Sequence, residues 1–82
     1  MDQEAGPDWA AYRRGVGDRI REVRLRRNLT QEALADQAEV GRTTLQTIES
    51  GAPEAPRLAA LWRIARVLDV PVHDLLRDDP RY

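Results

Sequence analysis

The sequence contains no cysteine and no phenylalanine, and all 13 of its basic residues are arginine. The absence of cysteine excludes a disulfide framework and a thiolate metal site. No apolar run approaches the ~18 residues that a membrane span requires, and the acidic start MDQEAGPDW lacks the apolar core of an export signal. A chain of 82 residues, 41% of them hydrophobic, is one small domain with a thin core, which we expect in the cytoplasm.

The chain is also poor in the residues that catalysis needs. Ser50 is the only serine, and the only histidine, His73, lies far from it in the sequence. No glycine-rich phosphate loop is present, and so short a chain has little room for a ligand pocket. We therefore predict that the protein is not an enzyme and has no metal, no cofactor and no small-molecule ligand.

The charge balance argues against a partner that is a nucleic acid. The net charge is -1 and the pI is about 5.8, whereas proteins that bind nucleic acids usually carry a basic patch. The distribution is uneven, however: acidic residues gather at the two ends, and the segment 19–27 holds five arginines against one glutamate. The middle of the chain can therefore be locally basic. The alternative is that these arginines lie on solvated helix faces.

A helical pattern dominates the first third of the chain. Apolar residues recur at spacings of three or four from Trp9 to Val23. Gly15 and Gly17 interrupt the pattern, and each costs a helix about 1 kcal/mol relative to alanine. The segment is therefore either one long helix with a soft point, or a short leading helix followed by a second one from Asp18.

Shorter helical segments follow, and local signals mark their ends. Thr30 is a good N-cap, Asn28 suits a left-handed C-cap of the preceding helix, and Gly51 ends a later one. We predict helices at 31–38, 42–50, 57–68 and 72–76, no strand, a disordered tail at 1–7, a domain at 8–77 and a second tail at 78–82. The predicted core is Leu25, Leu29, Leu34, Ala38, Val40, Leu45, Ile48, Leu58, Leu61, Ile64, Ala65 and Leu68.

Several short motifs in a fixed order carry a family resemblance. In order, they are TQEALA at 30–35, VGRTTL at 40–45, IESG at 48–51 and IARVLDVPVHDLL at 64–76. Over about Gly17 to Leu76, the chain resembles the helix-turn-helix of the lambda-repressor/Cro-type (XRE) family. The resemblance implies an all-α, compact five-helix lambda-repressor-like DNA-binding domain with a short N-terminal helical extension and its motif at 30–51.

Two residues depart from the pattern of that family. Glu39 stands where the family usually has a glycine, at a turn position that favours a left-handed backbone. Glu54 lies in the following loop, which in the family is often basic and contacts phosphates. We therefore expect a turn with some backbone strain and a weakened phosphate clamp.

The resemblance also implies roles for individual residues. The helix 42–50 would lie in the major groove, where arginine can fork onto guanine and glutamine can pair with adenine. The base-contacting residues would be Arg42, Thr43, Gln46 and Thr47. The phosphate-contacting residues would be Gln31, Ser50, Arg57 and Arg24, and Arg24 would also form an ion pair with Glu49. The alternative is that these are ordinary polar residues on solvated helix faces.

Two functions fit these features. The first is a sequence-specific DNA-binding transcriptional regulator, a repressor, that binds a double-stranded operator as a homodimer. The second is a protein-interaction module of the same fold, such as an antitoxin or accessory subunit bound to a partner protein. The acidic pI, Glu54 and the aromatic pair Trp9 and Tyr12, which lie outside the family domain, favour the second. The dimer interface is expected at Val72, Leu75 and Leu76, or at the face of Trp9 and Tyr12.

Overall fold

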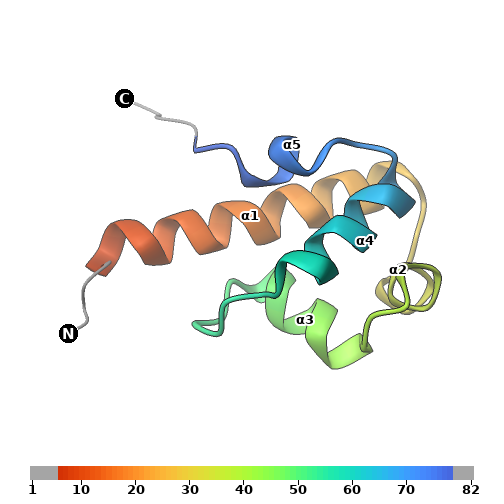
Figure 1. The fold of residues 1–82 in the computed structure, drawn as a ribbon, viewed down its shortest axis with the longest axis horizontal. Coiled ribbons are helices and arrows are strands. Elements are labelled where there is room, and N and C mark those ends of the chain that lie inside the picture. The colour runs from red at the N-terminus through yellow and green to blue at the C-terminus, as the bar shows by residue number, and fades with distance from the viewer. Residues whose placement is uncertain (1–5, 79–82) are drawn as a thin grey trace.

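A computed structural model describes residues 6–78 of the chain, and within this range the fold consists of five helices without a strand (Figure 1). The helices are α1 (Gly6–Arg26), α2 (Gln31–Ala38), α3 (Arg42–Ser50), α4 (Leu58–Leu68) and α5 (Val72–Leu76). The prediction of an all-helical, five-helix fold is confirmed. The tails predicted at 1–7 and 78–82 fall largely on residues 1–5 and 79–82, which lie outside the described range.

One continuous helix, α1, occupies the first third of the described chain. The two alternatives for this segment are thereby resolved in favour of the long helix, which begins at Gly6 rather than at Asp8. Residues 6 and 7, which the sequence places in the N-terminal tail, are helical in the structure. Proline is favoured in the first helical turn, where its missing N–H costs nothing. Asp8 in that turn also stabilises the helix start.

Gly17 marks the crossing of α1 and α3. A Cβ atom at this position would lie 2.5 Å from the carbonyl oxygen of Ile48 and 2.6 Å from that of Glu49. The bare glycine therefore lets the backbone of α3 pack directly against α1, which offsets its poor helix propensity.

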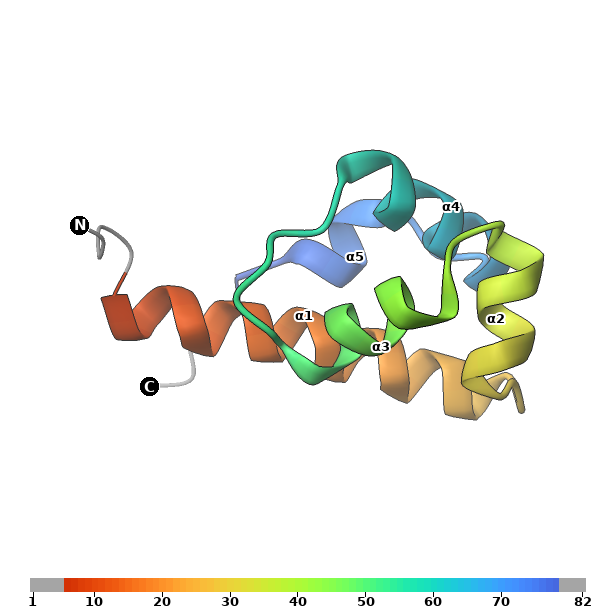
Figure 2. The ribbon, with the colours of Figure 1, turned by 90° about the horizontal axis from the view of Figure 1, so that it is seen from below.

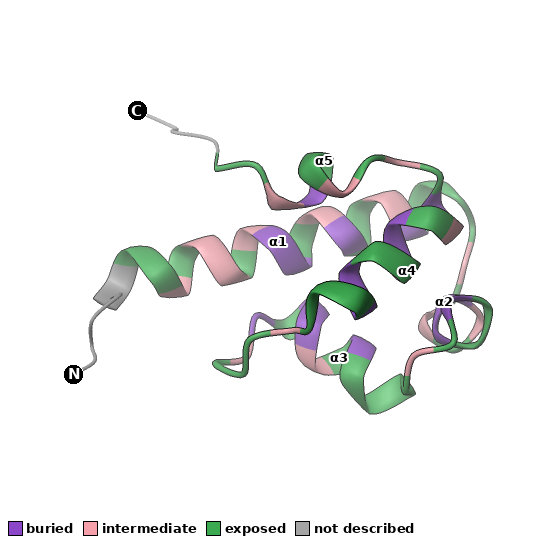
Figure 3. Ribbon diagram, viewed as in Figure 1, coloured by how far each residue is buried: buried purple, intermediate pink, exposed green. Residues whose placement is uncertain are grey.

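The packing brings α1 against α3 and α5, and α2 against α3 and α4 (Figures 1 and 2). The buried sides of the helices face one another (Figure 3). The fully buried large side chains are Ile20, Leu34, Leu45, Ile64, Leu68 and Leu75. Within the described residues, no helix combines the length and apolarity that crossing a membrane requires. The same residues contain no group of three or more His, Asp or Glu arranged to hold a metal ion.

Two predicted core residues are exposed. Leu25 is 57% exposed and Leu58 is 70% exposed. On α1 it is the neighbouring Arg24 that turns toward α3, so Leu25 points to solvent. Leu58 is the first residue of α4 and extends past the buried part of that helix, which begins at Ala60 and Leu61. Leu29 and Val40 are partly buried and pack against the core, as the sequence predicts.

The helix ends follow the local signals. The hydroxyl of Thr30 accepts a hydrogen bond of 3.0 Å from the backbone N–H of Ala33. Asn28 and Glu39 both have a φ of 58°, in the left-handed region, and Gly51 has a φ of 72°. Glu39 thus adopts the conformation for which the family usually has glycine, and the expected backbone strain is located in the turn between α2 and α3.

Candidate nucleic-acid interface

The outer face of α3 is polar and open to solvent. Arg42, Thr43 and Gln46 are exposed and Thr47 is half-buried, whereas Leu45 and Ile48 on the opposite side are buried (Figure 3). Residues three and four apart lie on the same side of a helix, so the four predicted base-contacting residues form one surface. This surface has the hydrogen-bonding groups that base edges can recognise.

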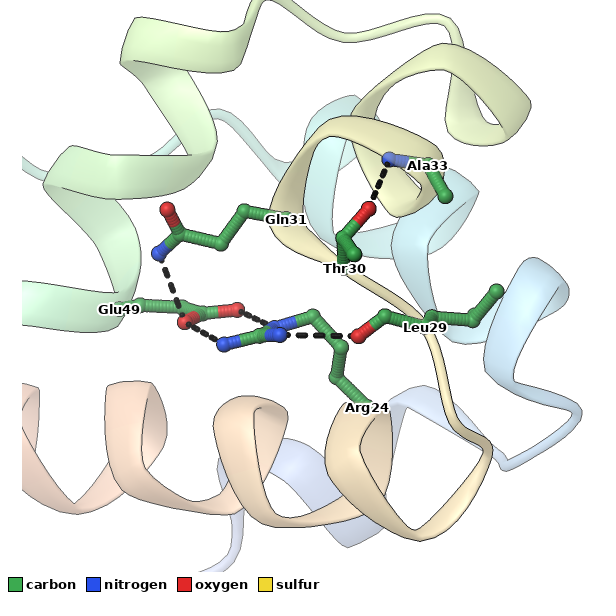
Figure 4. Close-up of polar contacts among 6 residues, drawn as sticks. All are labelled: Arg24, Leu29, Thr30, Gln31, Ala33 and Glu49. Carbon is green, nitrogen blue, oxygen red and sulfur yellow. Dashed lines mark hydrogen bonds and ion pairs between the residues drawn. The ribbon is translucent and has the colours of Figure 1, made fainter.

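A buried polar cluster fixes the inner side of α3 (Figure 4). The guanidinium of Arg24 donates through Nε to Oε2 of Glu49 at 2.7 Å and through Nη2 to Oε1 at 3.0 Å. Its Nη1 donates to the carbonyl oxygen of Leu29 at 2.9 Å. Gln31 completes the cluster, because its Nε2 donates to Oε1 of Glu49 at 3.0 Å. One carboxylate of α3 therefore joins the end of α1 and the start of α2.

The Arg24–Glu49 ion pair implied by the resemblance is present and almost fully buried, with side chains 9% and 2% exposed. Bidentate arginine–carboxylate pairs are the strong and geometrically specific form of this interaction. Because the pair connects two helices across the core, it sets the orientation of α3 relative to α1. Its role is to hold the outer face of α3 at a defined angle.

The phosphate contacts implied by the resemblance are unevenly supported. Arg24 is 8% exposed and three of its N–H groups are already bonded, so the contact predicted for it does not fit its burial. Gln31 is half-buried and keeps one side-chain N–H beyond the bond to Glu49. Ser50 is exposed, but its hydroxyl donates to the carbonyl oxygen of Thr47 at 2.9 Å and would have to rotate to meet a phosphate. Arg57 is exposed immediately before α4.

A surface groove runs between α3 and the start of α4. Thr43 and Thr47 line it on the α3 side, and Arg57 and Arg63 line it on the α4 side. Two carboxylate side chains, Glu39 and Glu54, also line this groove. Arg63 could not be identified from the sequence, because nothing in the sequence places a residue of α4 beside α3.

A second interaction that the sequence analysis missed lies at the beginning of α3. Arg42 forms an ion pair with Glu32, with 2.9 Å between Nη2 and Oε2. Both side chains remain well exposed, at 57% and 62%. The two residues are in the first turns of α3 and α2, so they meet only because the turn between these helices folds one N-terminus beside the other.

The fold and this site define a class of protein. The model of the helix-turn-helix family matches residues 20–75, and the chain belongs to that family, in its XRE-type branch. The match begins after Trp9 and Tyr12, so residues 6–19 of α1 lie outside the matched domain.

Individual relatives fall in the same class. The chain is 33% identical over 69 residues to the HTH-type transcriptional regulator SinR of Bacillus licheniformis, covering 82% of this chain and 62% of that protein. It is 33% identical over 60 residues to the cryptic phage CTXphi transcriptional repressor RstR of Vibrio cholerae, covering 73% of this chain and 53% of the repressor. The chain therefore spans little more than half the length of these relatives.

Solved structures agree with the fold. The chain superimposes on SinR in its crystal structure with DNA with a TM-score of 0.71 and 34% identity, covering 74% of this chain and 97% of that chain. It also superimposes on the complex of SinR protein with SinI protein, with a TM-score of 0.74 and 33% identity, covering 77% of this chain and 61% of that chain.

Proposed function

We propose that the protein is a sequence-specific DNA-binding transcriptional regulator that inserts α3 into the major groove. The observation that carries the proposal is the division of α3 into two sides. The outer side exposes Arg42, Thr43 and Gln46, and the inner side is locked to α1 and α2 through Glu49. A polar helix face held rigidly by its scaffold is what a recognition helix requires. The named regulators among its relatives, and SinR in complex with DNA, support the same function.

The proposed recognition uses the chemistry of each side chain. Arg42 forks onto O6 and N7 of a guanine, and Gln46 pairs with N6 and N7 of an adenine. Thr43 and Thr47 donate or accept hydrogen bonds, or pack their methyl groups against thymine. Each good bidentate contact contributes about 1–3 kcal/mol of discrimination between bases.

The proposed phosphate contacts surround this helix. Gln31 stands at the N-terminus of α2, where the helix dipole and a free N–H favour an anion. On the other side of α3, Arg57 and Arg63 line the groove and supply the cations that the loop with Glu54 lacks. Ser50 contributes once its hydroxyl turns from Thr47. Affinity should therefore fall as salt rises.

We further propose a cytoplasmic repressor that acts as a homodimer. A single small domain offers a limited footprint on DNA, and two copies would read half-sites about one helical turn apart. Among the residues expected at the interface, Leu75 is 1% exposed and already serves the core. Val72 and Leu76 are half-buried and Trp9 is 37% exposed, so these residues remain available to a second copy.

The test is selection of bound DNA from a random library at two salt concentrations. We expect enrichment of a two-fold symmetric site whose half-sites are about one turn apart, with binding that weakens at the higher salt. Failure to enrich any sequence at either salt concentration would overturn the proposed function.

An apolar cleft favours the second candidate, a module that binds a partner protein. It has a volume of about 170 Å³ and is walled by Trp9, Tyr12, Val16, Leu61 and Leu76, among other residues. Its α1 wall comes from the part of the chain that the family model does not match. A partner that co-purifies in stoichiometric amount and is lost in Trp9→Ala, but retained in Arg42→Ala, would support this function. A monodisperse homodimer without any such partner would refute it.

A further inference from the structure

The outer face of α3 formed by Arg42, Thr43, Gln46 and Thr47 is the proposed reading surface. The Glu32–Arg42 ion pair adds a carboxylate to this surface. Arg42 is the first residue of α3, and Glu32 lies in the first turn of α2. Their side chains meet at 2.9 Å, outside the core. A negative charge beside a helix that approaches DNA needs a reason, because it repels the phosphates that hold the complex together.

Stability of the fold does not supply that reason. An ion pair with both side chains more than half exposed adds little to folding, because water and salt screen it. The relative placement of α2 and α3 is already secured by the part-buried hydrogen bond from Gln31 to Glu49. The consequence of the pair therefore lies in the conformation of Arg42 itself.

An arginine that reads guanine must place a long, flexible side chain in one geometry. Its guanidinium carries five N–H donors, so one edge can bond to a carboxylate while another edge remains free for O6 and N7 of guanine. A partner that already holds the guanidinium reduces the conformational entropy that the arginine side chain loses when it binds DNA. Glu32 is placed to be this partner before DNA arrives.

The same carboxylate discriminates against unmatched DNA. When Arg42 finds no guanine, Glu32 still repels the nearby phosphates and still competes for the guanidinium. When guanine is present, the fork contact compensates for the repulsion. Both effects increase the difference in affinity between specific and non-specific DNA.

We propose that Glu32 is a positioning residue that holds Arg42 for guanine and weakens binding to DNA that lacks it. The inference rests on the proposed function, because it requires Arg42 to contact a base. It predicts two changes, one in the base preference at a single position of the recognised site and one in the affinity for DNA that lacks the guanine.

The experiment compares Glu32→Gln with a matched control, Asp36→Asn, in the full chain. Both variants remove one negative charge from the exposed side of α2, and no partner of Asp36 contributes to the reading surface. Binding is measured on the selected site, on the same site with the guanine replaced, and on a random duplex. Helical circular dichroism checks that each variant is folded.

We expect Glu32→Gln to lower the preference for guanine at one position about 3–10-fold, a part of the discrimination that a bidentate contact provides. It should also strengthen binding to the random duplex by a factor of roughly two to five at low salt, and less at high salt. Asp36→Asn should leave the guanine preference unchanged. In an Arg42→Ala background, Glu32→Gln should no longer alter the preference for any base.

Two failures can be told apart. If wild-type protein shows no guanine preference that Arg42→Ala removes, both the proposed function of Arg42 and this inference are overturned. If that preference exists and Glu32→Gln retains it in full, the role of Glu32 alone is overturned.

Discussion

Replacing Glu49 by glutamine should destabilise the protein severely, although the two side chains have nearly the same shape. The substitution removes the counter-charge of Arg24 in a site where the two side chains are only 9% and 2% exposed. Arg24 then remains buried as an uncompensated cation, and both Arg24 and Gln31 lose an acceptor with full negative charge. Breaking a buried ion pair from one side typically costs about 3–5 kcal/mol.

That cost is large for a chain of this size. A domain of 82 residues has a total stability of about 4–12 kcal/mol, if each residue contributes roughly 0.05–0.15 kcal/mol. A loss of about 3 kcal/mol should lower the midpoint of thermal unfolding by roughly 12–24 °C. Because Glu49 also orients α3, DNA affinity should fall even at temperatures where the variant is folded.

The assay is urea denaturation followed by helical circular dichroism, with Arg21→Gln as the matched control. Arg21 forms an exposed pair with Asp18 at 2.7 Å, with side chains 45% and 63% exposed, so its loss should cost at most about 1 kcal/mol. If Glu49→Gln does not fold, Arg24→Lys takes its place. It keeps the positive charge but cannot form the bidentate hydrogen bonds, and it should show an intermediate loss in the free energy of unfolding. A cost for Glu49→Gln no larger than that for Arg21→Gln would refute the reasoning.

Three further predictions use the same structure. Glu39→Gly should raise the free energy of unfolding by about 1 kcal/mol, because it relieves a left-handed residue with a φ of 58°; an unchanged urea midpoint would contradict it. Gly17→Ala should lower that free energy by at least about 1–3 kcal/mol, because its Cβ would lie 2.5 Å from the carbonyl oxygen of Ile48; wild-type thermal stability would show that α1 and α3 are farther apart. Arg63→Ala should reduce the slope of log affinity against log salt by about one unit for every DNA sequence. The control Arg66→Ala, whose guanidinium stacks on Trp62 at 4.9 Å, should leave that slope intact, and equal slopes for both variants would exclude Arg63 from phosphate contact.

Local signals explain why the helix boundaries were predictable. Thr30 caps α2 through its own hydroxyl, and Gly51 ends α3 in a left-handed conformation that glycine adopts without strain. Each signal depends on residues within about one helical turn, which a sequence displays directly. The helices predicted at 31–38 and 42–50 therefore have the same first and last residues as α2 and α3.

Burial at the helix margins was not predictable in the same way. Apolar spacing assigned Leu25 and Leu58 to the core, yet both are exposed. At the end of α1 it is Arg24 that turns toward α3, and Leu58 stands at the start of α4, ahead of the buried part of that helix. Conversely, the low helix propensity of Gly17 indicates a weak point in α1, whereas the structure shows that Gly17 is the contact point with α3. Both outcomes depend on packing between segments that are distant in the sequence.

The features of the candidate site also differ in whether the sequence could predict them. The residues on the outer face of α3 follow from helical periodicity and from the family motif. The bond of Gln31 to Glu49, the pairing of Glu32 with Arg42 and the position of Arg63 beside α3 arise only when α2 and α4 are docked. Electrostatic pairing across a turn has no fixed spacing in sequence, so no pattern could have indicated it.

The measurement that tests the central claim most directly is the base preference of Arg42→Ala against wild type. Both proteins are measured on the selected site with each base pair substituted in turn, and Arg21→Ala serves as the control for loss of one positive charge. We expect Arg42→Ala to lose the base preference at one base pair in each half-site, at a cost of about 1–3 kcal/mol, and to keep the preference at the other positions. An unchanged preference at every position, with affinity reduced equally for all sequences, would contradict it.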